Sequence, residues 1–110
     1  MEGFRVARDA MDRQTEIIAL SDSRSVLMLA AGQAKTLTVP SGATVALINA
    51  TAPVWVRFGG SAAVPSADIT DGSAPELNPG PRLVKEGMTI GVAAAQSSLV
   101  NILFYQGAKP

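Results

Sequence analysis

The stretch VPSGATVAL, at residues 39–47, is the strongest indication of the fold, because VKEGMTIGV at residues 84–92 repeats its pattern. Both stretches begin with valine, pass through a turn that contains glycine, and continue through threonine into alternating apolar residues. Glycine tolerates the positive φ of a tight turn, and alternation with a period of two is typical of a half-buried strand. Each stretch therefore predicts a strand, a turn and a second strand.

The same pattern extends beyond the repeat. Apolar residues alternate at positions 54, 56 and 58 and, with one residue of slippage, at positions 100, 102 and 104. We expect two similar strand–turn–strand–turn–strand meanders, over residues 34–58 and 81–105. Short strand patterns also coincide by chance, so a true duplication is one of two interpretations. Because one meander buries only one face, two meanders stacked face to face predict an all-β fold, a small β-sandwich.

The composition fits a single domain with partners. Of the 110 residues 47% are hydrophobic and 16% are charged, which is too apolar for a disordered chain. It is also rather apolar for a solitary monomer, which indicates surface buried against other chains. The formal net charge is zero, so the composition does not indicate a basic surface that would bind nucleic acid or an anionic membrane. No apolar run approaches the ~18 residues of a membrane span, and residues 1–5 lack the apolar segment of a secretory signal.

The absence of cysteine and histidine narrows the chemistry further. It excludes disulfides, the commonest zinc and copper sites, and nucleophiles that histidine activates. Without a plausible base or metal site we expect no enzyme, no catalytic residue and no cofactor.

Charge divides the chain into an arm and a body. Residues 1–24 hold nine of the eighteen charged residues, whereas residues 25–55 hold one, Lys35. We therefore expect an N-terminal arm over residues 1–24 and a β-sandwich body over residues 25–110, with a long loop at 59–80. The arm is expected to be extended or partly helical, with a short helix at residues 4–13 and an extended segment at 15–20. Its apolar residues have no obvious place in a two-sheet core and are predicted to contact a neighbouring chain: Phe4, Val6, Met11, Ile17 and Ile18.

The loop at 59–80 offers little for chemistry. Asp68, Asp71 and Glu76 could suggest a calcium site, but the loop lacks the EF-hand spacing and its bidentate glutamate. Turn-forming aspartates that accept hydrogen bonds from their own backbone are the simpler interpretation. A glycosidase pair of carboxylates is disfavoured because few aromatic residues are present to line a sugar site. Gly59 and Gly60 lack a following lysine and helix, so they indicate a bend at a strand end rather than a phosphate-binding loop.

Trp55 and Arg57 form the most suggestive pair. They lie on the face of their strand opposite Val56, and tryptophan and arginine are enriched at protein interfaces. The pair predicts a contact with another chain. The alternative is that Trp55 is buried within its own chain, beneath the arm or the second sheet.

Three elements in order resemble small virion structural proteins of tailed bacteriophages. They are the V-P-x-G-A turn at residues 39–43, the strand end V-x-V-x-x-G-G-S at 54–61 that opens into a small-residue loop, and the segment at 90–102 that ends in V-N-I. The resemblance covers residues 25–105 and not the arm. It implies a β-sandwich or jelly-roll-like module on the virion, commonly trimeric, that serves as a capsid decoration (cement) protein or as a fibre or spike component. It implies no catalytic residues.

The sequence as a whole favours a capsid decoration protein that binds between major capsid subunits. We expect a homotrimer on the exterior of the head, assembled in the host cytoplasm, with the major capsid protein as its partner. A tail or head fibre or spike module that contacts the host surface is the first alternative. A carbohydrate-binding β-sandwich is the second, although one tryptophan and one tyrosine provide few aromatic platforms.

Overall fold

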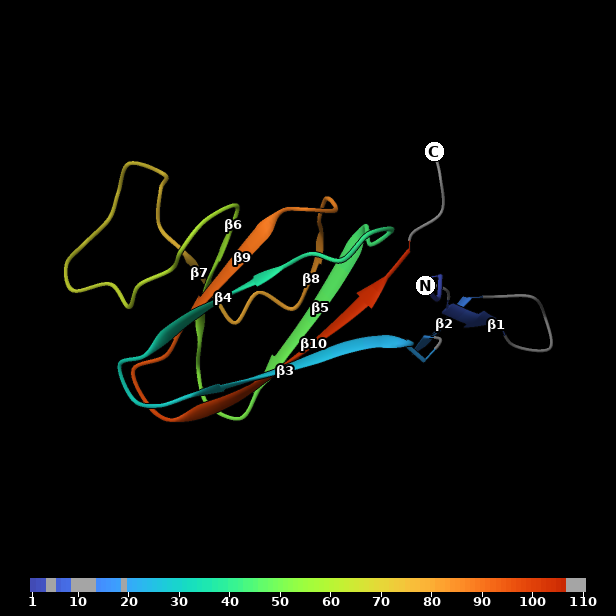
Figure 1. Ribbon diagram of the computed structural model, residues 1–110, viewed down its shortest axis with the longest axis horizontal. Helices are drawn as coiled ribbons and strands as arrows, with labels where there is room; N and C mark the ends of the chain where they lie inside the picture. The colour runs from blue at the N-terminus through green and yellow to red at the C-terminus, as the bar shows by residue number, and fades with distance from the viewer. Residues whose placement is uncertain (4–5, 9–13, 19, 107–110) are drawn as a thin grey trace.

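The computed structural model describes residues 1–3, 6–8, 14–18 and 20–106, with only the backbone described in the first two strands. The described chain is built from strands and contains no helix (Figure 1). The strands are β1 Val6–Arg8, β2 Gln14–Ile18, β3 Ser23–Leu29, β4 Ala34–Thr38, β5 Val45–Ala50, β6 Trp55–Phe58, β7 Glu76–Leu77, β8 Pro81–Leu83, β9 Thr89–Ala93 and β10 Ser98–Tyr105.

Eight strands form two packed antiparallel sheets, which confirms the β-sandwich. One sheet has the order β3-β10-β5-β8, and the other has the order β4-β9-β6-β7. The eight strands pair first with last and inward from there, as β3 with β10, β4 with β9, β5 with β8 and β6 with β7. A long hairpin rolled up in this way is the strand order of a jelly roll.

The prediction that each meander forms one sheet is wrong. Within residues 34–58 the chain alternates between sheets, because β4 and β6 belong to one sheet and β5 to the other. Residues 81–105 alternate in the opposite sense, with β8 and β10 in the sheet of β5. Strands of the two halves therefore interleave, and each turn carries the chain across the sandwich instead of back along one sheet. Apolar alternation looks the same whichever sheet a strand joins, so the pattern could not distinguish these arrangements.

The sequence repeat corresponds to two such crossing turns. Ala43 N donates to Pro40 O at 3.2 Å, and Gly42 has a φ of 86°. Met88 N donates to Lys85 O at 3.1 Å around Gly87, whose φ is 80°. A turn of this kind needs positive φ at its third residue, which explains the glycine at the same place in both copies.

The two turns lie beside each other at one end of the sandwich. Val39 N donates to the carbonyl of Met88 at 2.8 Å, and Val84 N donates to the carbonyl of Thr44 at 2.9 Å. The carboxylate of Glu86 accepts hydrogen bonds from Gly42 N at 2.8 Å and from the hydroxyl of Ser41 at 3.3 Å. The repeat therefore aligns β4 with β8 and β5 with β9. The two strands of each aligned pair belong to different sheets.

The core lies between the sheets and confirms the predicted inward faces. Val56 and Ile102 are fully buried, and Phe58 packs against the core from its margin. The inward side chains of both sheets form one cluster, whose largest fully buried members include Phe104, Ile90, Ile102, Val39, Val54, Val56, Val92 and Val100.

The arm forms a hairpin where a helix had been predicted. β1 pairs antiparallel with β2, and Val6 lies opposite Ile18 in the register. Residues 6–8 are therefore a strand, because their backbone pairs with β2 instead of forming local helical bonds. Residues 4, 5 and 9–13 of the predicted helix lie outside the described residues. The first strand of the body, β3, begins at Ser23.

Candidate interaction surfaces

Trp55 and Arg57 lie on the outer face of β6, as predicted. Arg57, however, makes a contact within its own chain, to the long loop. Arg57 is exposed, and its Nη2 donates to the carbonyl of Ser73 at 2.6 Å. Trp55 is half-buried and lies between Leu77 of β7 and Ala93 of β9 in the sheet register. The arginine therefore holds residues 61–75 near the sheet.

The start of the loop is seated on the outer face of β9. A side chain at Gly91 would place its Cβ 2.3 Å from Gly60 O and 2.5 Å from Ala62 N. No real Cβ approaches backbone atoms so closely, so only glycine allows this contact. Gly59 turns the chain out of β6 with a φ of 102°, which confirms the bend predicted at the strand end.

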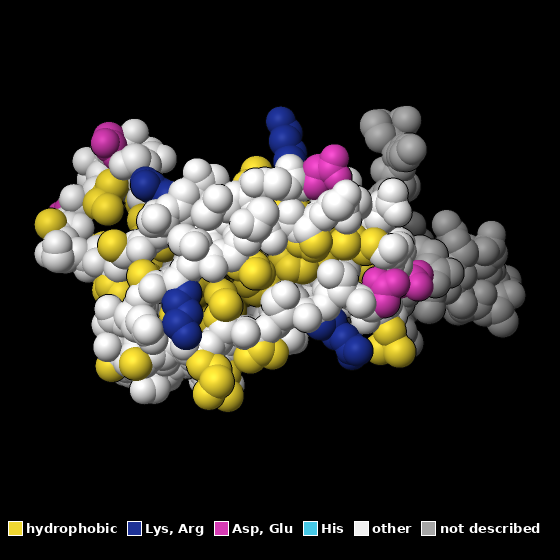
Figure 2. All heavy atoms as spheres, viewed as in Figure 1, with side chains coloured by type: hydrophobic (Ala, Val, Ile, Leu, Met, Phe, Trp, Pro, Cys, Tyr) yellow, Lys and Arg dark blue, Asp and Glu magenta, His cyan; other side chains and the backbone are white. Residues whose placement is uncertain are grey.

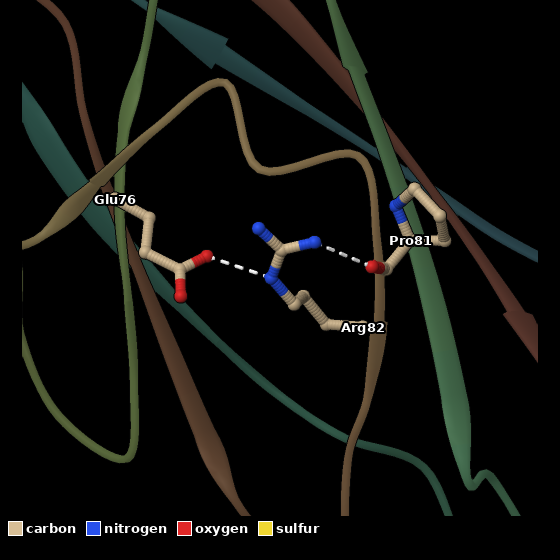
Figure 3. Close-up of polar contacts among 3 residues, drawn as sticks. All are labelled: Glu76, Pro81 and Arg82. Atoms are coloured by element: carbon tan, nitrogen blue, oxygen red, sulfur yellow. Dashed lines mark hydrogen bonds and ion pairs between the residues drawn. The ribbon is translucent and has the colours of Figure 1, made fainter.

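The end of the loop is fixed as well. Val54 N donates to Asn78 Oδ1 at 2.9 Å, and Asn78 N donates to Val54 O at 3.0 Å. Figure 3 shows Arg82 between Glu76 and Pro81, with Arg82 Nε 2.8 Å from Glu76 Oε2 and Nη1 donating to Pro81 O at 2.7 Å. This contact joins β7 to β8 where the chain crosses between sheets. Both charged side chains are about half exposed, so the ion pair contributes little alone.

Between these anchors the loop stands away from the sandwich, at the left of Figures 1 and 2. It encloses an open concavity of about 380 Å³, lined mainly by small side chains together with Arg57 and Ile69. Such a lining offers few polar groups to orient a ligand.

The three acidic residues of the loop do not form a cluster. Within the part of the chain that the structure describes, no three carboxylate, imidazole or thiolate side chains gather to hold a metal ion. The Ser73 hydroxyl donates to Asp71 Oδ1 at 2.6 Å, and Ser73 N donates to the same oxygen at 3.0 Å. These two hydrogen bonds lower the pKa of Asp71, and the nearby Arg57 adds a smaller lowering. Asp71 is thus engaged as a turn residue.

The base of the arm is pinned to the end of β10. Gln106 N donates to Glu2 O at 2.8 Å, and Gly3 forms a parallel bridge with Gln106. At the other end of the arm, the buried hydroxyl of Ser21 donates to the carbonyl of Phe104 at 2.7 Å. Glu2 N also donates to Asp22 Oδ1 at 2.9 Å, which joins the two ends.

The hairpin projects away from the body beyond these anchors, at the end opposite the loop (Figure 1). In the described residues β1 and β2 pair with each other and belong to neither sheet of the body. Of the five predicted arm contacts, Val6 lies in β1 and Ile17 and Ile18 lie in β2. Phe4 and Met11 lie outside the described residues.

A surface that the sequence analysis missed is the outer face of the sheet β3-β10-β5-β8. The register places nine apolar residues among its twelve outward positions. Val45 and Tyr105, at the end next to the arm, are buried, and the other seven reach the surface: Val26, Met28, Leu47, Pro81, Leu83, Leu99 and Leu103. Several are widely exposed, including Val26 at 62%, Met28 at 67% and Leu83 at 85%. Apolar side chains reach the surface along the lower border of Figure 2, where Figure 1 places β3.

The signal for this face was present in the sequence. Residues 26–29 and 99–105 are apolar at positions of both parities, whereas a strand with one solvated face alternates apolar and polar residues. The outer face of the other sheet is different, because its positions on β4 and β9 are threonine, alanine and glycine.

Together these features define an eight-stranded jelly-roll protein with a projecting arm at one end and an anchored loop at the other. No protein-family model, no curated protein and no solved structure matches the chain. The described residues include no helix with the length and apolar character of a membrane span.

Proposed function

We propose that this chain is a non-enzymatic structural protein of a tailed-bacteriophage virion, a decoration (cement) protein on the outside of the head. Its partner is the major capsid protein, and it joins the particle in the host cytoplasm. The observation that carries the proposal is the arm, a hairpin whose two ends are hydrogen-bonded to the end of β10 and whose strands join neither sheet of the described body. An isolated two-stranded hairpin is marginal in water, so a surface outside the chain is its natural support.

The arrangement of the molecule also supports attachment through one end. The arm lies at the end where β3 begins and β10 finishes, and the loop lies at the other end (Figure 1). A decoration protein needs one end for the capsid lattice and leaves the other exposed. Many identical attachment points on a lattice would make weak individual contacts collectively tight.

Three copies around a local three-fold axis are part of the proposal, with Trp55 and Arg57 as contact residues between them. The half-buried Trp55 has surface left for a neighbour, whereas Arg57 would have to keep or exchange its bond to Ser73. Arg57→Ala would then weaken the trimer and loosen the loop together.

The direct test is cryo-electron microscopy of heads assembled with and without this chain. The proposal expects extra density of about 11 kDa per copy on the outer surface, at junctions between capsid subunits. Density confined to the tail or to fibres would favour the fibre or spike alternative. Particles that lack the chain altogether would contradict both assignments.

A further inference from the structure

The four edge strands of the sandwich are not equally protected. Edge strands present unpaired N–H and C=O groups, which proteins usually shield with short strands, prolines or inward charges. β7 has two residues, and β8 has three and begins with Pro81. β4 carries Lys35 opposite the buried Val92, at an inward position. β3 has seven residues, no proline and no inward charge.

The side chains of β3 add to this exposed edge. Val26 and Met28 point outward and are 62% and 67% exposed, and Met28 lies opposite Leu99, which is 47% exposed. Beside them is a mostly apolar hollow of about 320 Å³, lined in part by Val26, Leu99 and Asn101. Unpaired main-chain groups and exposed apolar side chains thus coincide along one strand, and the matching partner is another extended strand.

We propose that this partner is β3 of a second copy, paired antiparallel about a two-fold axis at Val26. This register pairs all seven residues and places Val26 opposite Val26 and each Arg24 opposite the other copy's Met28. The two Arg24 residues then lie about 13 Å apart along the strands. That separation exceeds the screening length of about 8 Å at physiological salt, so the pair meets little repulsion. The zero net charge of the chain removes long-range repulsion as well.

The paired copies would share one continuous eight-stranded sheet. Its apolar outer face would run across the junction, so that Val26 and Met28 of each copy gain apolar neighbours. A two-fold contact uses the same patch on both chains, which is the commonest way in which homo-oligomers close. The inference goes beyond the proposed capsid role, because the contact requires neither the capsid nor the arm.

The first test is the mass of the purified chain in solution, without capsids, measured by light scattering. We expect two chains per particle, or six where the three-fold contact also forms. Val26→Lys would place like charges opposite each other and is expected to halve that mass. Leu83→Lys is the matched control, because Leu83 is an exposed apolar residue of the same face on the opposite edge strand, and it should leave the mass unchanged. An odd number of wild-type chains, or a mass that Val26→Lys leaves unchanged, would overturn the proposal.

A second test keeps the inference decidable if the lysine variant fails to fold. The chain has no cysteine, so Val26→Cys introduces a single thiol into an otherwise inert protein. Directly opposed residues in an antiparallel pair have Cα atoms about 4.5–5.5 Å apart, within the range that a disulfide bridges. Mild oxidation should convert most of the Val26→Cys chains to covalent dimers and few of the Leu83→Cys chains. Equal cross-linking of the two variants would contradict the β3 contact, whatever the capsid experiments give.

Discussion

At the scale of single residues, glycine and serine decide where the long loop lies. The bend at Gly59 is predictable from residue type alone. The role of Gly91 is not, because the backbone that requires it comes from residues about thirty positions earlier and meets it only in the folded chain. A glycine inside a strand is ambiguous until the segment above it is known.

Gly91→Ala should therefore destabilise the protein. The added Cβ meets the backbone of residues 60–62, which must lift from the sheet, and overpacking of this kind costs about 1–3 kcal/mol. Gly60→Ala is the matched control, because its Cβ would meet only Arg57 Cδ at an ordinary 3.6 Å. Urea denaturation of both variants measures the difference. Equal stabilities within a few tenths of a kcal/mol would show that the loop does not rest on β9.

Asp71 gives a prediction that depends on pH. Its pKa is lowered chiefly by the hydrogen bonds from Ser73, so the folded carboxyl should lose its charge only below the range of an ordinary aspartate. Its contribution to stability is present above the unfolded pKa and is lost as the pH falls through the folded pKa. Ser73→Ala should move the Asp71 titration, followed by NMR, back toward the ordinary value. An unchanged titration in that variant would contradict the cause assigned to the shift.

At the scale of elements, most strands of the body and their inward faces were predictable, and their partners were not. β7 lies inside the segment predicted as a loop at 59–80, because two residues are too short a run to show alternation. Alternation around Val56 and Ile102 identified the core side of each strand, because a half-buried strand must alternate. The same alternation does not indicate which sheet a strand joins, because that depends on pairing between strands far apart in the chain, such as β3 with β10. The repeat was recognised correctly as a repeated turn and interpreted wrongly as a repeated sheet.

Truncation of the core at Val56 tests the register of β6. Val56→Ala should cost about 1–3 kcal/mol of unfolding free energy, through lost burial and a residual cavity. Leu83→Ala, at an exposed site on β8, should change it by less than about 0.5 kcal/mol. Thermal or chemical denaturation distinguishes the two. A cost at Val56 as small as at Leu83 would mean that the inward face of β6, and with it the outward position of Trp55, is assigned wrongly.

At the scale of the whole molecule, two surfaces remain for partners, the projecting arm and the outer face of the sheet β3-β10-β5-β8. The arm was predicted as a separate segment from its concentration of charge. The apolar face was not predicted, because the inward residues of each strand were assigned first and the apolar residues between them, such as Met28 and Leu99, were not considered as a second face. Neither charge nor alternation could indicate that the arm would be pinned at both of its ends to β10.

Capsid binding by a chain that begins at Leu20 tests whether the arm attaches this protein to the head. This truncation removes the hairpin and retains Ser21, whose hydroxyl bonds to Phe104 in the body. We expect a folded sandwich, verified by circular dichroism, that cosediments with undecorated capsids far more weakly than the full chain. Full occupancy of capsids by the truncated protein would contradict the arm as the attachment device, and failure of the full chain to bind any capsid would contradict the function itself.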